Sequence, residues 1–469
     1  MISRVLDVRA PAHRPFARLW PVLVLLLSVG VGIALVSQPM LAVVPLAALL
    51  SAVLLIDGRA RLAVVVFGGL FVLQRPGGLD TPKLALLGAF VVAFAGAFLN
   101  VSKLRQTAAY EAAGPLLAAS YAFAALGVFG LAVAYAGHGS LVEAVRDAVP
   151  YLLFATTPIF AIDAQATLSR TALVRVLIAA GTVTAIAFAV TWLQRRGIAY
   201  LPIARVGVAT VFVPAALFSY AMSIVLQAAG RRPRWLLLAA ALLALLVATG
   251  TRTTLALLVA PLAIVAASRR HVATRSFRLA LLAPIAVAMT LLFAVAVVQL
   301  TDADTDFLQQ RVSLLRSTGD SASDASFNDR REQGGVAWAA FTSSPLFGVG
   351  PGYPFEWTPQ GLSPRRDFVM DTPLTFPAKF GLVGLAVLLF VATRFWSFVR
   401  RLGDDGPPRT WYLALVGYLG VVVALCAFAP PFEDKGFSYG LILLLAIALG
   451  SVRATSGSLR PGSSTRASP

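Results

Sequence analysis

Long apolar runs separated by short polar segments dominate this chain. A bilayer core about 30 Å thick needs roughly 20 apolar residues per helix, and fewer where neighbouring protein shields the helix ends. Fourteen runs approach that length. They lie near residues 20–36, 39–56, 61–73, 84–99, 115–136, 150–162, 172–193, 206–227, 235–249, 254–267, 279–300, 374–399, 411–429 and 437–452. The pattern predicts an all-α polytopic membrane protein with about 12 to 14 transmembrane helices, because the runs at 61–73 and 150–162 are short enough for one of them to be re-entrant or interfacial.

Composition agrees with this pattern and excludes a water-soluble fold. The 469 residues are 58% hydrophobic and 13% charged, and the mean hydropathy is +0.81. An ordinary soluble domain carries about 25% charged residues. The net charge of +18 would suggest a nucleic-acid binder in a soluble protein, but here the basic residues interrupt apolar runs at intervals. They indicate membrane topology, and we expect no nucleic-acid partner.

The distribution of basic residues predicts the orientation of the helices. If the N-terminus is cytoplasmic, the inner segments hold 23 basic and 6 acidic residues, and the outer segments hold 14 basic and 15 acidic residues. This asymmetry favours both termini inside. The first apolar run has no small-residue cleavage site behind it, so we interpret it as a retained helix. We therefore expect a multi-pass protein of the cell's inner (plasma) membrane.

The runs divide the chain into five predicted regions. These are a cytoplasmic N-terminal segment at 1–19, transmembrane helices 1–11 at 20–300, a large extracytoplasmic loop at 301–373, the last three transmembrane helices at 374–452, and a disordered cytoplasmic tail at 453–469. The loop is far longer than a connecting turn, and loops of that length are usually functional or disordered. From Gly334 onward its aromatic, proline and glycine content predicts packed structure resting on the membrane helices.

The residue types available for chemistry exclude several classes of site. Cys426 is the only cysteine and the chain has three histidines, which leaves little room for a metal centre built from these side chains. Neither a Walker A loop nor a dinucleotide fingerprint occurs, so ATP- or NAD-driven chemistry has no support. We expect no cofactor and no metal.

Arginines on the predicted outer face are the first candidate site residues, because a guanidinium binds phosphate bidentately and stays charged. Arg205 lies at the mouth of the eighth run. Arg252 lies among threonines in a polar break between two apolar runs, and Arg330 and Arg331 open the structured half of the loop. The alternative interpretation is that outer arginines extend to the lipid headgroups and bind nothing else.

Two further candidates follow in the same loop. Gly348, Gly350 and Gly352 in SSPLFGVGPGYPFEW permit backbone conformations that let a turn approach a sugar or phosphate closely, or form a rigid corner. Asp371, before the twelfth run, is either a helix cap or a carboxylate that accepts a proton from an attacking hydroxyl, and both roles can hold together. Lys379 follows within the first turns of that run.

These residues resemble a known family, the O-antigen ligase and polymerase superfamily of bacterial membrane proteins. The resemblance covers about residues 200–400 and includes the large outer loop before three final helices. It rests on the order and spacing of Arg205 with Gly207 and Pro214, the T-x-x-R break ending at Arg252, Arg330 upstream of SPLFGVGPG, and the closing KFGLVGLAVLL.

The resemblance implies a GT-C-like, metal-independent glycosyltransferase that takes a glycan from a polyprenyl-diphosphate carrier and passes it to a hydroxyl of a glycan, lipid or protein acceptor. It implies that Arg205, Arg252, Arg330 and Arg331 hold the diphosphate, with the active site facing outward. Members of the family often carry His-Asn before the twelfth helix, whereas this chain has MDTPL there. Asp371 is the candidate replacement base. A transporter or flippase of a lipid-linked glycan and a non-catalytic subunit of an envelope polysaccharide machine remain alternatives.

Overall fold

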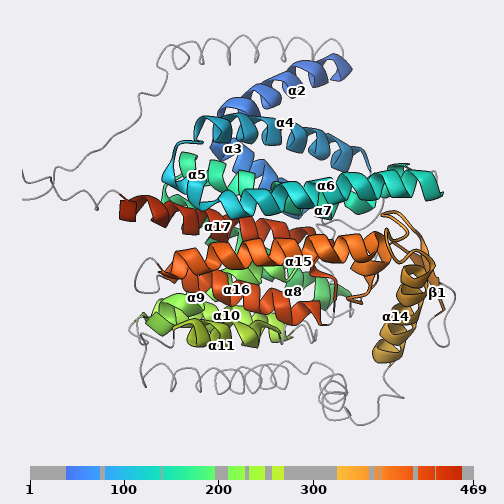
Figure 1. Ribbon diagram of the computed structural model, residues 1–469. Coiled ribbons are helices and arrows are strands. Elements are labelled where there is room, and N and C mark those ends of the chain that lie inside the picture. The colour runs from blue at the N-terminus through green and yellow to red at the C-terminus, as the bar shows by residue number, and fades with distance from the viewer. Residues whose placement is uncertain are drawn as a thin grey trace, which may run out of the picture.

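A computed structural model of the protein describes most of the predicted membrane helices and the second half of the loop (Figure 1). The described residues are 39–73, 80–138, 141–195, 210–227, 232–248, 256–268, 325–358, 365–368, 370, 372–404, 410–427 and 429–456.

Helices form nearly all of the described chain. They are α2 (Pro39–Ile56), α3 (Gly58–Ala63), the π-helix η1 (Val64–Leu73), α4 (Thr81–Lys103), α5 (Ala108–Ala112), α6 (Gly114–His138), α7 (Leu141–Thr167), α8 (Arg170–Arg195), α9 (Phe212–Gln227), α10 (Pro233–Ala248), α11 (Val259–Ser268), α14 (Ala325–Ser343), α15 (Thr375–Asp404), α16 (Thr410–Cys426), the 3₁₀-helix η4 (Pro431–Glu433) and α17 (Lys435–Ser456). The all-α prediction needs one addition, because β1 (Phe355–Trp357) and β2 (Arg365–Asp367) pair as a small antiparallel sheet within the loop.

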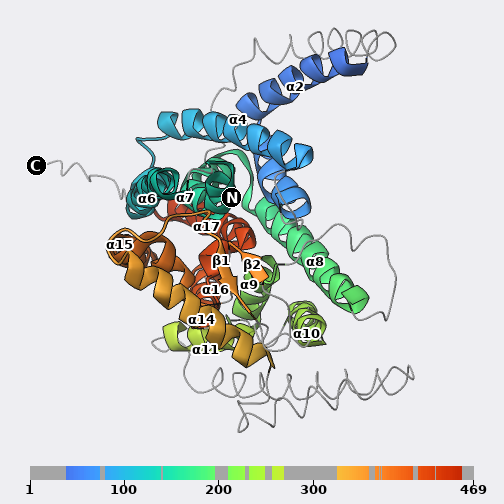
Figure 2. The same ribbon diagram turned by 90° about the vertical axis from the view of Figure 1, so that its right-hand side faces the viewer.

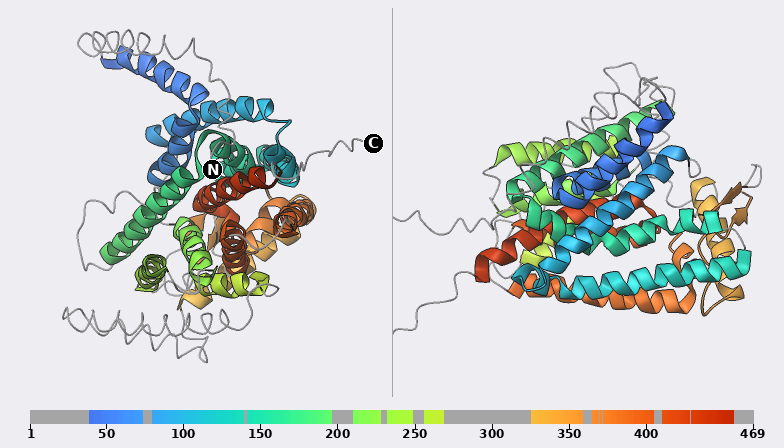
Figure 3. Two further views of the ribbon diagram at one scale, coloured as in Figure 1. Left: turned by 90° about the vertical axis from the view of Figure 1, so that its left-hand side faces the viewer. Right: turned by 90° about the horizontal axis from the view of Figure 1, so that it is seen from above.

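Among the described helices, α4, α6, α7, α8 and α15 are long and apolar enough to cross a membrane. Shorter apolar helices, including α9, α16 and α17, run beside them in one bundle (Figures 1 and 3). These helices support the prediction of a multi-pass membrane protein. The short run at 150–162 lies inside the 27-residue helix α7, because the polar residues before it are helical as well. The run at 61–73 is divided between α3 and the π-helix η1.

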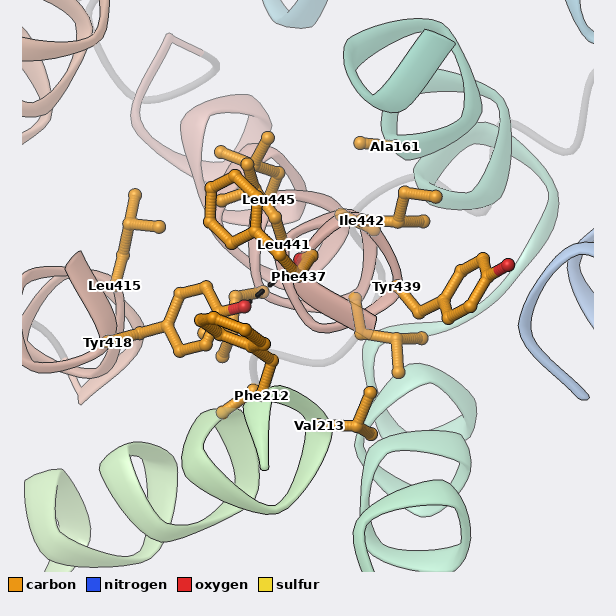
Figure 4. Close-up of a cluster of buried hydrophobic side chains, with 14 of the residues drawn as sticks. Ala161, Phe212, Val213, Leu415, Tyr418, Phe437, Tyr439, Leu441, Ile442 and Leu445 are labelled. Carbon is orange, nitrogen blue, oxygen red and sulfur yellow. Dashed lines mark hydrogen bonds between the residues drawn. The ribbon is translucent and has the colours of Figure 1, made fainter. Parts of the chain in front are cut away.

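The core of the bundle surrounds α17, which lies between α7 on one side and α9 and α16 on the other (Figure 2). From Phe437 to Leu449 its apolar side chains are almost completely buried, and α9 is likewise buried on all faces. A helix that is apolar all round belongs inside a bundle. Figure 4 shows Phe437 of α17 packed with Tyr418 of α16 and Phe212 of α9, and the Tyr418 hydroxyl donates a hydrogen bond to the Phe437 carbonyl at 3.0 Å.

A buried ion pair fixes one end of α7 to the N-terminal helices. The Arg61 guanidinium donates two hydrogen bonds to the Asp163 carboxylate, at 2.7 and 2.6 Å, and Asn100 donates a third at 2.6 Å. Arg61 also donates to the carbonyls of Leu54 and Leu55 in the last turn of α2. Because both charges are paired and hydrogen-bonded, this cluster is a structural joint between α2, α3, α4 and α7.

The described part of the loop forms a small unit at one end of the bundle, where α14 and β1 lie in Figure 1. Its own core consists of Ala337, Ala340, Phe355, Trp357, Met370 and Ala378. Asp329 of α14 accepts a hydrogen bond from the Trp357 indole at 2.7 Å, which fixes α14 to β1. The prediction of packed structure from Gly334 onward is confirmed for the described residues of that range, and α14 begins before it, at Ala325.

Candidate functional site

The loop returns to the bundle through a break in α15. Gly381 has a φ of 60° and interrupts the helix, so the two helical hydrogen bonds that would join Leu382 to Ala378 and Val383 to Lys379 are absent. The turn after α14 replaces them. Leu382 and Val383 donate instead to the carbonyls of Pro345 and Leu346, while the carbonyls of Ala378 and Lys379 accept from Val349 and Gly350 at 2.9 and 3.0 Å. The backbone N–H and C=O groups left free at the helix break are therefore hydrogen-bonded to those of the turn.

The three glycines of this turn are required by geometry. Gly348, Gly350 and Gly352 have φ values of 71°, 85° and 80°, a region that residues with a Cβ rarely occupy. A Cβ would lie 2.3 Å from the carbonyl carbon of Lys379 at Gly348, 2.8 Å from the Ala134 nitrogen at Gly350, and 2.6 Å from the Ala144 nitrogen at Gly352. Protein backbone from α6, α7 and α15 thus occupies the space that the glycines open, as the rigid-corner interpretation expects. Contact between this turn and a substrate stays a prediction.

Directly beneath the turn lies a buried charge cluster formed by Lys379, Asp147, Glu433 and Tyr151. The Lys379 ammonium donates to Asp147 Oδ1 and to Glu433 Oε1, each at 2.8 Å. The Gly352 amide donates to Asp147 Oδ2 at 2.7 Å, and the Tyr151 hydroxyl donates to Glu433 Oε1. The Lys379 side chain is fully buried. This cluster joins the loop to α7, α15 and η4.

In this cluster a single lysine is hydrogen-bonded to two carboxylates, and the pKa of one of them is raised. Burial raises the pKa of Glu433 from 4.5 to about 7, against the attraction of Lys379, and repulsion from Asp147 adds to the rise. Glu433 lies in η4, between two helices. Its second oxygen, Oε2, is buried and has no hydrogen-bond partner among the described residues.

Helix α14 carries two of the predicted arginines. Arg331 is exposed and Arg330 is partly buried, and neither makes an ion pair or hydrogen bond with another described residue. Gly334 follows Arg330 by one helical turn on the same face. A Cβ at Gly334 would lie 3.9 Å from Thr372 Oγ1, so the face that carries Arg330 approaches the segment returning to α15. Among the described residues nothing neutralises the Arg330 charge on this face.

A comparison with models of known protein families gives a match to part of the chain. Residues 236–376 match the family model described as O-antigen ligase. The match covers less than half of the chain, so it shows a similarity to that family over these residues, which we call the O-antigen ligase region. No curated protein and no solved structure matched the chain.

The O-antigen ligase region contains most of the predicted site residues. Arg252, Arg330, Arg331, Asp371 and the three glycines fall within it, whereas Arg205 precedes it and Lys379 follows it. Of these, Arg205, Arg252 and Asp371 lie outside the described residues. This similarity points to a ligase- or polymerase-type role in polysaccharide assembly.

Sequence reasoning missed the partners of Lys379, which lies just beyond the O-antigen ligase region. Asp147 and Glu433 are 232 and 54 positions away from it, and no local pattern marks so distant a pairing. A weak signal existed, because both acids lie within a few residues of an apolar run, as in PPFEDKG. Helix α7 also buries two acidic side chains, Asp147 and Asp163.

Proposed function

We propose that this protein transfers a saccharide from a polyprenyl-diphosphate carrier to a hydroxyl group of a glycan, lipid or protein acceptor, on the outer face of the plasma membrane. The observation that carries the proposal is the match of residues 236–376 to the O-antigen ligase family, since this range runs from α10 through the loop to the start of α15. The reaction belongs to cell-surface polysaccharide assembly, as ligation or polymerisation.

In the proposed reaction the acceptor oxygen attacks the sugar carbon bonded to the diphosphate. The bond from this carbon to the diphosphate oxygen breaks, and polyprenyl diphosphate leaves with the electron pair. Arg205, Arg252, Arg330 and Arg331 stabilise the charge that develops on the leaving diphosphate, so no metal ion is needed. Asp371 accepts the proton of the attacking hydroxyl.

Two features of the described residues support these roles. Arg330 and Arg331 have no charged partner among the described residues, and arginines placed in this way suit a diphosphate. The α14 face that carries Arg330 also approaches Thr372, the residue next to Asp371. The helix that carries one proposed phosphate ligand therefore approaches the described start of the segment that returns to α15.

The buried charge clusters favour a second candidate, a transporter of lipid-linked glycans. Ionisable groups within membrane helices often mark ion pathways, and α7 carries one cluster near each end. In both clusters the opposite charges are paired at 2.6 to 2.8 Å. This pairing agrees with a structural role, and we rank transport second.

Purified protein in proteoliposomes distinguishes the two functions. The donor is a polyprenyl-diphosphate oligosaccharide, the buffer contains EDTA, and release of polyprenyl diphosphate is followed with the appearance of elongated or ligated glycan. The proposal predicts release coupled to transfer under chelation. Movement of the intact donor between leaflets without any release would contradict it and favour the transporter.

A further inference from the structure

The membrane bundle contains a large apolar cavity between α11, α15 and α16. Its volume is about 980 Å³, which is at the upper end of the range for small-molecule pockets. The inner wall is aromatic, with Phe154 of α7, Phe432 of η4 and Phe437 of α17. We call it the α15–α16 cavity.

The lining of the α15–α16 cavity selects a hydrocarbon ligand. Thr393 supplies the one hydroxyl among the described lining residues, and this hydroxyl donates to the Phe390 carbonyl at 2.7 Å. Water would find few partners in such a space. An aliphatic chain would instead bury apolar surface against the wall and gain contacts with it.

The cavity extends from the bundle interior to the exposed surface of the helices. Phe395 and Phe437 are buried in the wall, whereas Trp396 of α15 and Val423 of α16 line the same cavity and are 68% and 71% exposed. Helices α15 and α16 lie side by side in Figure 1. A lipid chain can therefore enter sideways from the bilayer.

The position of the cavity connects it with the charge cluster under the loop. Phe432 directly precedes Glu433, and Phe154 lies one helical turn after Tyr151, so the aromatic wall separates the cavity from the cluster. If the headgroup of a lipid contacts the loop, its hydrocarbon chain needs an apolar channel directly below the loop. The α15–α16 cavity provides such a channel.

We propose that the α15–α16 cavity binds the isoprenoid chain of the polyprenyl-linked donor while its diphosphate and glycan contact the loop above. This inference rests on the proposed function, because that function supplies the donor. The inference assigns recognition of the lipid chain to α15, α16 and the aromatic wall.

Photo-crosslinking tests the inference. The protein in phospholipid nanodiscs is illuminated with a polyprenyl diphosphate that carries a diazirine in its chain, and the modified peptides are mapped by mass spectrometry. We expect modification within residues 388–399 and 416–426. We also expect competition by unlabelled polyprenyl diphosphate and none by the same excess of phosphatidylglycerol.

Two tryptophan variants on α15 provide a matched pair. Ala392→Trp places a ring in the cavity and should lower crosslinking about tenfold, because the space is then filled. Ala386→Trp lies on an exposed position of the same helix outside the cavity and should leave crosslinking unchanged. Cys426, the only cysteine, lines the cavity, so slower alkylation by a lipid-soluble maleimide in the presence of polyprenyl diphosphate gives a second readout.

Equal competition by phosphatidylglycerol would mean that bilayer lipid fills the cavity, and crosslinks confined to other helices would place the chain elsewhere. Either result overturns the inference. The proteoliposome assay keeps the two hypotheses apart. Glycan transfer together with crosslinks outside the cavity would reject the cavity alone, whereas absence of transfer would reject the proposed function.

Discussion

The ammonium of Lys379 lies 2.8 Å from Glu433 Oε1, although 54 residues separate them and both are buried beneath the loop. Asp147 accepts a second hydrogen bond from the same ammonium and one from the Gly352 amide. Lys379 is thus the point where the loop, α7, α15 and η4 meet. Its position indicates that it positions the loop, and direct contact between Lys379 and substrate stays a prediction.

Removing this cation should destabilise the protein strongly. Lys379→Met leaves two carboxylates buried without their cation, and breaking a buried ion pair in this way costs about 3–5 kcal/mol of unfolding free energy. The measurement is the thermal midpoint of the purified protein in detergent. Lys103→Met, at an exposed position at the end of α4, should change the midpoint little. An unchanged midpoint in Lys379→Met would show that the cluster is not a structural joint.

The glycine turn should not tolerate a methyl group. Gly350→Ala forces a residue with a Cβ to a φ of 85° and against the Ala134 backbone at 2.8 Å, so we expect loss of the turn's contacts with α15. Hydrogen exchange of residues 344–352 measures this loss. Gly335→Ala is the matched control, because nothing lies within 4 Å of its Cβ position and alanine favours the helix. Equal exchange in both variants would contradict the required geometry.

Stability should depend on pH through Glu433. Its pKa in the folded protein, about 7, lies above the value of 4.5 that applies when it is unfolded. The folded state therefore holds the proton more tightly, and the stability contributed by Glu433 is complete below pH 4.5 and lost as the pH rises through 7. Thermal midpoints between pH 4.5 and about 7.5 should fall more in the wild type than in Glu433→Gln. Glu356→Gln, at a 69% exposed site, should follow the wild type; parallel curves for all three proteins would refute this assignment.

Asp371 should affect the chemical step more than donor binding. Asp371→Asn removes the proposed proton acceptor and keeps a side chain that can cap a helix. We expect a lower transfer rate with nearly unchanged donor affinity, measured separately in single-turnover and binding experiments. Asp367→Asn on β2 is an exposed control in the same loop. Equal loss of rate and affinity would favour the capping role.

The sequence pattern predicted much of the membrane architecture, because hydrocarbon thickness constrains helix length. The twelfth run was expected to begin at residue 374, and α15 begins at Thr375. The run at 150–162 gave too short a helix, since a hydropathy pattern does not detect the polar turns that α7 adds before it. The orientation of the helices stays a prediction.

The candidate site was less predictable. Glycine spacing indicated a special turn at 348–352 but could not tell whether ligand or protein backbone fills the space, and the backbones of α6, α7 and α15 fill it. The Lys379 cluster depends on tertiary packing of three separate helical segments, and a single sequence does not encode that pairing in any local pattern. The sequence identified Gly350, because a glycine-rich turn is a local pattern. It did not identify Asp147 and Glu433 as partners of Lys379.

The most direct test of the proposed function compares two loop arginines. Arg330→Ala removes a proposed diphosphate ligand from α14, and Arg366→Ala removes a 61% exposed arginine of β2 that faces Glu356. The measurement is release of polyprenyl diphosphate from the donor by purified protein in proteoliposomes with EDTA. We predict that Arg330→Ala lowers release roughly a hundredfold, as loss of a charge-stabilising group does, and that Arg366→Ala releases at the wild-type rate. Equal rates in Arg330→Ala and the wild type would contradict the role of Arg330 at the diphosphate.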